Sequence, residues 1–263
     1  MTRLHAVLIG VNKYADITIP DLSYARADAL AFAELFGQAL YASSVQVHPL
    51  VDGQATRSGI IDLIGVRLAQ IVDRRDAVLI FFAGHGSPEI HPGVDKVSRF
   101  LVCHDTQRHA LLSSAIEVHT DLARLASRLN ARLVVFILDA CFSGYSDGRG
   151  ITGPLLAEQR RTHRPRIRLE NLPLGSGTIF LSACADDEVA REDGTLGHGV
   201  FSYYLLEQLR SPGATNVIGL ASLYDLVFHQ VRDYSNGRQN PVLWGDLKGA
   251  GLPRLLIPGS DHG

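Results

Sequence analysis

Short, uninterrupted runs of apolar residues recur along this chain of 263 residues, and they constrain its fold more than any other feature. Hydrophobicity that continues through a strand, rather than alternating, indicates that both faces of the strand are covered, as in parallel sheets. Five such runs are predicted to form strands: 4–9, 45–51, 77–83, 132–138 and 178–182. A sixth, weaker run covers 241–244 and is also predicted to form a strand.

Segments with helical periodicity lie between these runs. An apolar stripe with the spacing of a half-buried helix is found over 25–40, 58–72, 121–129, 200–209 and 223–234. Thr56 and Thr120 stand just before two of these segments and are expected to cap them. Strands that alternate with helices predict an α/β fold in which a doubly wound parallel sheet carries helices on both faces.

Two stretches depart from this alternation. Residues 86–120 hold His, Pro, Gly and charges around one apolar piece, 100–103, and predict a loop with a minor strand or hairpin. Residues 145–177 are rich in Gly, Pro and Arg, and a loop this long inside a compact domain is usually functional. We therefore expect a single domain with a larger part, 1–144, a linker, 145–177, and a smaller part, 178–263.

The composition excludes several classes of protein. With 25 Lys and Arg against 27 Asp and Glu, the chain lacks the basic excess of a dedicated nucleic-acid surface. No apolar run approaches the roughly 20 residues needed to span a bilayer, and the start lacks the features of a signal peptide. Three cysteines without a CxxC pair form neither a disulfide framework nor a closed zinc site. We expect a cytoplasmic protein without nucleic-acid or membrane partners.

Candidate catalytic residues directly follow two of the predicted strands. The run 77–83 breaks into a turn in which His85 stands between two glycines, and the run 132–138 leads into Asp139 and Cys141. Ligands of open parallel sheets bind beyond the carboxyl ends of the strands. If these two strands are neighbours, the imidazole and the thiol emerge side by side in a single solvent-accessible cleft, which is the arrangement of nucleophilic catalysis by cysteine.

Other interpretations of the polar residues remain open at this point. Cys184 also ends a strand and is a rival nucleophile, although the acids at 186–188 raise the pKa of a neighbouring thiol. Cys103 beside His104 suggests a metal site, but no paired ligand spacing supports one. A third interpretation takes the turn 84–87 as the phosphate-binding nest of a nucleotide enzyme, but the chain lacks a GxGxxG motif and a P-loop lysine.

Two of these motifs carry a resemblance to a known family. AVLIFFAGHG and LVVFILDACFSG, which places Cys141 56 residues after His85, resemble the caspase-like cysteine peptidases, especially the metacaspases and their bacterial relatives. Similar segments extend over nearly the whole chain: LHAVLIGVNKY, LSYARADALAFAELF, TIFLSACADDEVARE, GHGVFSYYLLEQL and GRQNPVL. The resemblance implies a caspase-haemoglobinase-like fold, with a mostly parallel six-stranded sheet sandwiched by helices, and peptide-bond hydrolysis through an acyl-enzyme.

The resemblance also implies a role for each site residue. Cys141 would attack the scissile carbonyl, and His85 would act as acid and base. The backbone N–H groups of Gly86 and Cys141 would stabilise the oxyanion. No third residue that orients His85 can be identified from the sequence.

Two acids are expected to set the specificity. By resemblance, Asp139 lines the pocket for the residue before the cleaved bond, and Asp28, in YARADAL, is a second acid of that pocket. A carboxylate there selects Arg, or Lys, through a charge-assisted contact. The alternatives are that Asp139 pairs with an arginine or caps a turn, and that Asp28 is a first-turn helix acid.

The linker offers such an enzyme a substrate within its own chain. A run of arginines is ordinarily a charged surface. Because cleavage after Arg is expected, however, we predict autoprocessing at the linker arginines: Arg160, Arg161, Arg164, Arg166 and Arg168.

The sequence also departs from the metacaspase pattern. Phe142 stands where the family usually has His, and Ala83 where it has Ser. Calcium is bound by several oxygen ligands, and the acids at 105, 117, 121 and 147 are few for such a site. No required cofactor or metal is therefore expected, and calcium activation stays open.

The expected partners are a protein or peptide substrate and a regulatory protein or small-molecule signal. Two functions follow: a regulated bacterial defence or cell-death protease, or a catalytically silent caspase-like signalling or scaffold module.

Overall fold

A six-stranded sheet forms the centre of the computed structural model, which describes residues 3–38, 44–90, 97–143, 148–151, 177–210, 217–246 and 254–256. In sheet order its strands are β12 (Val242–Asp246), β8 (Thr178–Ser182), β7 (Leu133–Asp139), β3 (Ala77–Ala83), β1 (Leu4–Gly10) and β2 (Val45–Val51). All neighbours run parallel except β12, which is antiparallel to β8. The predicted mostly parallel sheet is confirmed.

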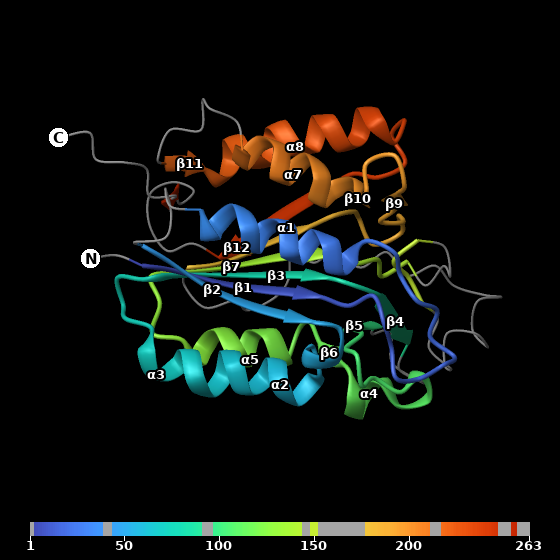
Figure 1. The fold of residues 1–263 in the computed structure, drawn as a ribbon, viewed down its shortest axis with the longest axis horizontal. Coiled ribbons are helices and arrows are strands. Elements are labelled where there is room, and N and C mark those ends of the chain that lie inside the picture. The colour runs from blue at the N-terminus through green and yellow to red at the C-terminus, as the bar shows by residue number, and fades with distance from the viewer. Residues whose placement is uncertain are drawn as a thin grey trace.

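Helices cover both faces of this sheet (Figure 1). One face carries α1 (Ala25–Gly37), α7 (Val200–Arg210) and α8 (Leu220–Tyr234). The other carries α2 (Arg57–Asp62), a π-helical stretch (Leu63–Leu68), α3 (Ala69–Ile71) and α5 (Asp121–Arg128). Leu79 and Phe81 of β3 lie in the first of the two cores, whereas Ile80 and Phe82 lie in the second. The strands are apolar throughout because they supply both layers.

The two predicted helix caps have different outcomes. Thr56 caps α2, since its hydroxyl accepts a hydrogen bond from the Gly59 N–H at 3.1 Å. The prediction for Thr120 is wrong. Its backbone is already helical, and its hydroxyl donates to the Glu117 carboxylate at 2.7 Å instead of accepting from the first turn of α5.

The stretch 86–120 is more ordered than predicted. It holds a small antiparallel sheet of β4 (Gly86–Ile90), β5 (Val97–Leu101) and β6 (Ile116–Glu117). The 3-10 helix Arg108–Ala110 and α4 (Leu111–Ser114) lie between β5 and β6. The minor strand covers 97–101 rather than 100–103. Its polar start is buried because Arg99 pairs with Asp186 at 2.6 Å, so apolar runs alone do not reveal it.

Both predicted parts of the chain contribute to the same sheet. β8 and β12 come from 178–263 and extend the sheet formed by the earlier strands. Four shorter strands form two antiparallel pairs: β9 (Glu192–Asp193) with β10 (His198–Gly199), and β11 (Val217–Gly219) with β13 (Arg254–Leu256). Most of the predicted linker lies outside the described residues.

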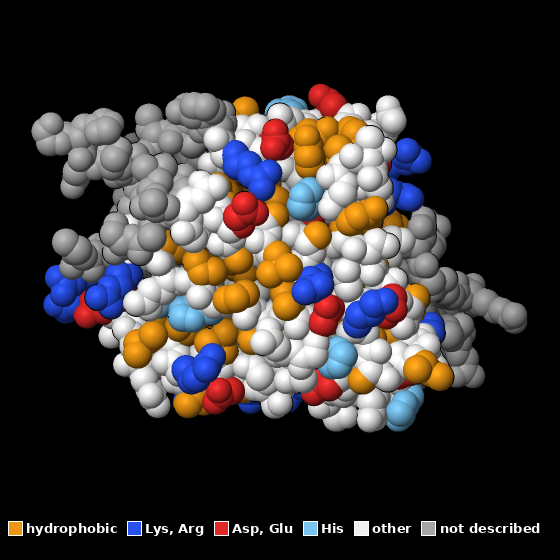
Figure 2. Space-filling model, in the orientation of Figure 1, with side chains coloured by type: hydrophobic (Ala, Val, Ile, Leu, Met, Phe, Trp, Pro, Cys, Tyr) orange, Lys and Arg blue, Asp and Glu red, His pale blue; other side chains and the backbone are white. Residues whose placement is uncertain are grey.

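Basic and acidic side chains are mixed on the surface of the described residues. Figure 2 shows Lys and Arg side chains interspersed with Asp and Glu on the face it draws, as a net charge of −2 leads one to expect. Among the described residues, no helix is both long enough and apolar enough to cross a membrane.

Candidate active site

The turns that leave β3 and β7 meet at one edge of the sheet. Ala83 is in register with Asp139, and the Gly84 N–H donates to the Asp139 carbonyl at 3.3 Å. The strands are therefore neighbours, and residues 84–86 and 139–141 emerge together, as the sequence motifs required. The register follows from pairing two apolar strands of equal length between the same two helical layers.

His85 is held in one orientation by the chain that follows β1. Its Nε2 lies 2.8 Å from the Pro20 carbonyl, and its N–H donates to the Tyr14 hydroxyl at 3.0 Å. A carbonyl can only accept, so Nε2 carries the proton and Nδ1 of the neutral ring has a free lone pair. Burial lowers the pKa of His85 to about 4, although its contacts with the backbone of Pro20 and Arg149 oppose this. A neutral imidazole is a proton acceptor at physiological pH.

Pro20 is the orienting group that the sequence did not reveal. It lies 65 residues from His85 and contributes a backbone carbonyl, so no side-chain motif marks it. Nδ1 of His85 is buried and has no hydrogen-bond partner among the described residues.

The Cys141 thiol is surrounded by hydrogen-bonding groups. Its Sγ lies 2.9 Å from the Ser143 hydroxyl and 3.0 Å from the Glu188 carbonyl. A hydrogen bond with the Cys184 thiol and the bonds from Ser143 lower the pKa of Cys141 to about 7, against the opposing effect of burial. Within the described ranges no hydrogen bond joins this sulfur to His85. Hydrogen bonds between catalytic groups are often absent before substrate binds.

The other two cysteines are poorer nucleophiles. The contact with Cys141, followed by burial, raises the pKa of Cys184 well above its ordinary value. The acidic neighbour Glu188 contributes less than we expected from the sequence. Burial raises the pKa of Cys103, which lies in the opposite core. Of the three thiols, Cys141 is the one most readily ionised.

This contact between thiols can be measured. The ultraviolet absorbance of thiolate is expected to appear with a midpoint near pH 7 in the parent protein and to be lost in Cys141→Ala. In Cys184→Ala the midpoint should rise, because the S–H donor that stabilises the thiolate is gone. Cys103→Ala is the matched control and should leave the midpoint unchanged. An unmoved midpoint in Cys184→Ala would show that the contact with Cys184 does not lower the pKa of Cys141.

Two backbone donors converge on a single oxygen. The N–H groups of Gly86 and Cys141 both donate to the Arg149 carbonyl, at 2.9 and 3.2 Å. Gly86 must lack a side chain, since a Cβ there would lie 2.4 Å from the Cys141 carbonyl and 2.9 Å from the Phe142 ring. Two N–H groups that converge on one oxygen in this way can stabilise negative charge on it.

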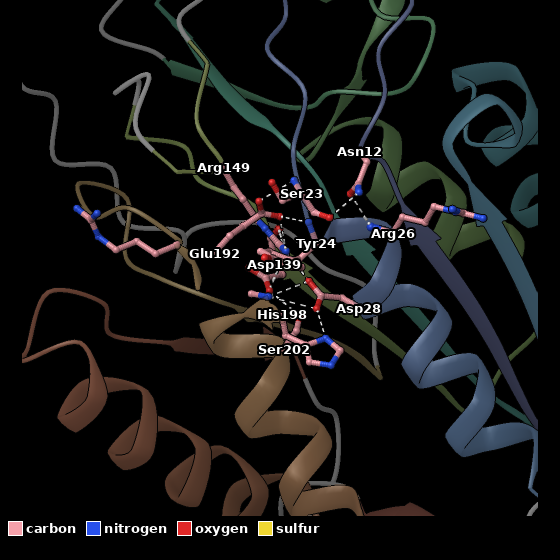
Figure 3. Close-up of polar contacts among 12 residues, drawn as sticks. Asn12, Ser23, Tyr24, Arg26, Asp28, Asp139, Arg149, Glu192, His198 and Ser202 are labelled. Carbon is pink, nitrogen blue, oxygen red and sulfur yellow. Dashed lines mark hydrogen bonds and ion pairs between the residues drawn. The ribbon is translucent and has the colours of Figure 1, made fainter. Parts of the chain in front are cut away.

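The Arg149 side chain fills a pocket of carboxylates (Figure 3). Its guanidinium pairs with Asp139 at 2.8 Å, with Glu192 at 3.2 Å and with Asp28. Arg149, Asp139 and Asp28 are all completely buried. Burial alone would lower the pKa of Arg149, but the three carboxylates raise it above its ordinary value. The structure therefore brings together Asp139 and Asp28 in one acidic pocket.

Neighbouring groups hold these carboxylates in place. Asp139 accepts a hydrogen bond from the Ser202 hydroxyl at 2.5 Å, and Asp28 contacts His198 Nδ1 at 2.7 Å. Burial, and after it the negative charge of Asp28, raises the pKa of Asp139 to about 6 against the influence of Arg149. The Glu192 carboxylate also accepts the N–H groups of Ser23 and Tyr24, at 2.8 and 2.9 Å, which ties the pocket to the start of α1.

Several features of this site were not predicted. The sequence interpretation assigned no role to Glu192, His198 or Ser202, although all three lie in segments that carry the family resemblance. They reach the pocket because β10 and α7 pack against α1. The interpretation also expected a solvent-accessible cleft between His85 and Cys141, but both are buried, with the Arg149 backbone against them. The five linker arginines expected to be processed lie outside the described residues. Among the described residues, no group of three or more His, Cys, Asp or Glu is arranged to hold a metal ion.

Comparison with known proteins gives consistent results. The family model of the caspase domain matches residues 3–249. Among solved structures, protein GSU0716 from Geobacter sulfurreducens is similar with a TM-score of 0.70 and 17% identity, covering 94% of each chain. Caspase-1 from Spodoptera frugiperda is similar with a TM-score of 0.60 and 14% identity, covering 100% of this chain and 92% of its own. No curated protein matches the sequence.

Proposed function

The chain belongs to the caspase domain family, and from this premise we propose that it is a cysteine endopeptidase that cleaves proteins after arginine, and more slowly after lysine, through Cys141 and His85. One observation supports this most directly. The guanidinium of Arg149 pairs with three carboxylates, and its carbonyl oxygen accepts hydrogen bonds from the N–H groups of Gly86 and Cys141. A substrate arginine before the scissile bond needs the same two contacts.

The proposed chemistry gives each group of the site one role. The Cys141 sulfur attacks the scissile carbonyl carbon while its proton passes to Nδ1 of His85. The two N–H groups stabilise the oxyanion that forms, and losing one such donor typically costs about 3 kcal/mol in the barrier. His85 then gives the proton to the departing nitrogen, which leaves a thioester on Cys141. Water hydrolyses the thioester and returns the thiol.

The pocket supports arginine as the preferred residue. Asp139, Asp28 and Glu192 bring three carboxylates to one guanidinium, so a substrate aspartate would be repelled. Arginine reaches two carboxylates through separate nitrogens of its planar fork, whereas lysine offers one compact charge. Arginine should therefore bind more tightly than lysine.

The occupied pocket also supports a regulated enzyme. A protease whose specificity pocket is filled by its own chain must be switched on before it meets other substrates. We propose that a partner protein or a small-molecule signal does this, and that the enzyme acts in a defence or cell-death response.

A silent scaffold is the second candidate, and the same observation favours it. If Arg149 is a permanent counter-ion, the pocket never opens, and the buried Cys141 and His85 never meet a substrate. The ionisable thiol with a pKa of about 7 and the free Nδ1 lone pair argue for the enzyme, since a scaffold has no use for either.

A panel of fluorogenic peptides separates these candidates. We expect release from peptides ending in Arg, roughly tenfold weaker release from Lys, and none above background from Asp or Leu. Each peptide should be assayed with and without calcium, with the heat-denatured protein as the control. Release from Asp peptides would contradict the acidic pocket, and no release from any peptide, with or without calcium, would favour the scaffold.

A further inference from the structure

The thiols of Cys141 and Cys184 lie side by side beyond the carboxyl ends of β7 and β8. Cys141 Sγ lies 3.0 Å from the Glu188 carbonyl oxygen, and Cys184 Sγ lies 3.6 Å from the same oxygen. Both side chains belong to the core on the face of the sheet that carries α1, α7 and α8. Cys103 lies in the core on the opposite face. Of the other two thiols, Cys184 is therefore the one within reach of the Cys141 sulfur.

Strand pairing holds these two residues at the spacing of a disulfide. The parallel pairing of β7 with β8 ends at Leu138 and Ser182. Two residues further on, Cys184 comes opposite Ala140, and its sulfur lies 4.0 Å from the Ala140 carbonyl. Cys141 is the next residue, so one strand spacing and the rise of one residue put the two Cα atoms about 6 Å apart. Disulfides span Cα separations of about 4.4–6.8 Å, so the two sulfurs can bond without moving the strands.

Resting on the proposed function, we propose that a peroxide converts Cys141 and Cys184 into a reversible disulfide, which switches the peptidase off because its nucleophile is no longer free. The Cys141 sulfur is buried but close to the surface, since the Ser143 hydroxyl 2.9 Å away belongs to a partly exposed residue. The contact with Cys184, and after it the bonds from Ser143, lower the pKa of Cys141 to about 7. Much of this thiol is therefore ionised at neutral pH, and the thiolate is the form that peroxides oxidise.

The oxidation balances with one molecule of hydrogen peroxide. The Cys141 thiolate attacks one peroxide oxygen, so that an S–O bond forms and the O–O bond breaks. The departing hydroxide takes up the proton that the thiol had released, which gives water and a sulfenic acid on Cys141. The Cys184 sulfur then attacks the Cys141 sulfur, the S–O bond breaks, and the hydroxyl leaves with the Cys184 proton as a second water. Each sulfur gives up one electron, and these two electrons reduce the peroxide.

The first step prepares the second. The contact with Cys141, and after it burial, raises the pKa of Cys184 well above its ordinary value. Once the Cys141 sulfur has bonded to oxygen, it is no longer a thiolate that accepts the Cys184 S–H, so this contribution is lost and Cys184 releases its proton more readily. The neighbouring thiol then closes the disulfide before further oxidation makes an irreversible sulfinic acid.

Counting the free thiols of the whole chain tests the proposal. The parent, Cys103→Ala and Cys184→Ala are reduced, treated with hydrogen peroxide, alkylated under denaturing conditions, digested and analysed by mass spectrometry. The parent should go from three free thiols to one, that of Cys103, and yield a peptide pair joined through Cys141 and Cys184. Cys103→Ala should yield the same pair. Cys184→Ala should yield none and end with a sulfinic acid on Cys141.

Hydrolysis of an arginyl peptide gives a second readout on the same samples. Peroxide should lower the rate of the parent and of Cys103→Ala at least tenfold, and dithiothreitol should return both to within about twofold of their starting rates. Cys184→Ala should also be inactivated by peroxide but should not recover, because a thiol does not reduce a sulfinic acid.

The parent alone decides the proposal, whether or not Cys184→Ala folds. A parent that keeps three free thiols, joins Cys141 to Cys103, or forms disulfides only between chains would overturn it, as would a joined pair that leaves peptide hydrolysis unchanged. If the reduced parent cuts arginyl peptides but no joined pair forms, the disulfide proposal is wrong and the proposed function stands. If the joined pair forms but the reduced parent cuts no peptide, the proposed function fails and the disulfide stands.

Discussion

Replacing Cys141 with alanine is expected to lower kcat/KM for arginyl peptides by at least about a thousandfold. The reason is that the thioester cannot form without this sulfur, and the remaining oxyanion donors and pocket supply only binding and charge stabilisation. The measurement is the initial rate of peptide hydrolysis by freshly purified parent and variant at saturating and limiting substrate.

The other two buried cysteines are matched controls for this substitution. Cys103→Ala removes a thiol of the same burial from the opposite core and should leave kcat/KM within about twofold. Cys184→Ala removes the S–H group that lowers the Cys141 pKa, so about a tenfold loss is expected near neutral pH. Full activity in Cys141→Ala together with complete loss in Cys184→Ala would identify Cys184 as the nucleophile.

The charge of Asp139 carries the second large effect. Asp139→Asn keeps the size of the side chain but removes one of the carboxylates that face the guanidinium at 2.8 Å. Truncating one partner of a buried charge pair costs about 2–5 kcal/mol, so kcat/KM for arginyl peptides should fall by roughly 30- to 5,000-fold. The loss should be expressed mainly in KM, since the role proposed for Asp139 is to bind the substrate side chain and not the reacting atoms.

A pH series adds a second readout. The pKa of Asp139 is raised to about 6, so this carboxyl gains a proton and loses its charge as the pH falls through that value. The difference between parent and Asp139→Asn should therefore shrink below pH 6 and be greatest above it. A difference that does not change with pH would mean that the lost charge is not the cause.

Asp121 provides a control for the loss of a paired carboxylate. It pairs with Arg57 at 3.1 Å and with Arg124 at 2.8 Å, on the face of the sheet that carries α5. Asp121→Asn should lower the unfolding temperature while kcat/KM stays within about twofold. If Asp139→Asn lowers only the unfolding temperature in the same way, Asp139 is a structural partner of Arg149 and Ser202 and does not select substrates.

The strands could be predicted because their signal is local. A continuous apolar run needs no knowledge of its neighbours, and the bounds of β2, β3 and β8 agree with the prediction to the residue. The start of β5 could not be predicted in this way. Ser98 and Arg99 are buried there by partners distant in sequence, so the local pattern is polar.

The sequence by itself determined the layered fold and pointed to His85, Cys141 and Asp139, because each follows an apolar strand and the parallel register brings those strand ends together. Only the tertiary structure decided what surrounds them. The Pro20 carbonyl that orients the imidazole and the Arg149 carbonyl on the two N–H donors are backbone groups, which carry no residue signature. The third carboxylate, Glu192, reaches the guanidinium from 43 residues away, and Asp28 from 121. Such contacts follow from packing in three dimensions, and no local periodicity encodes them.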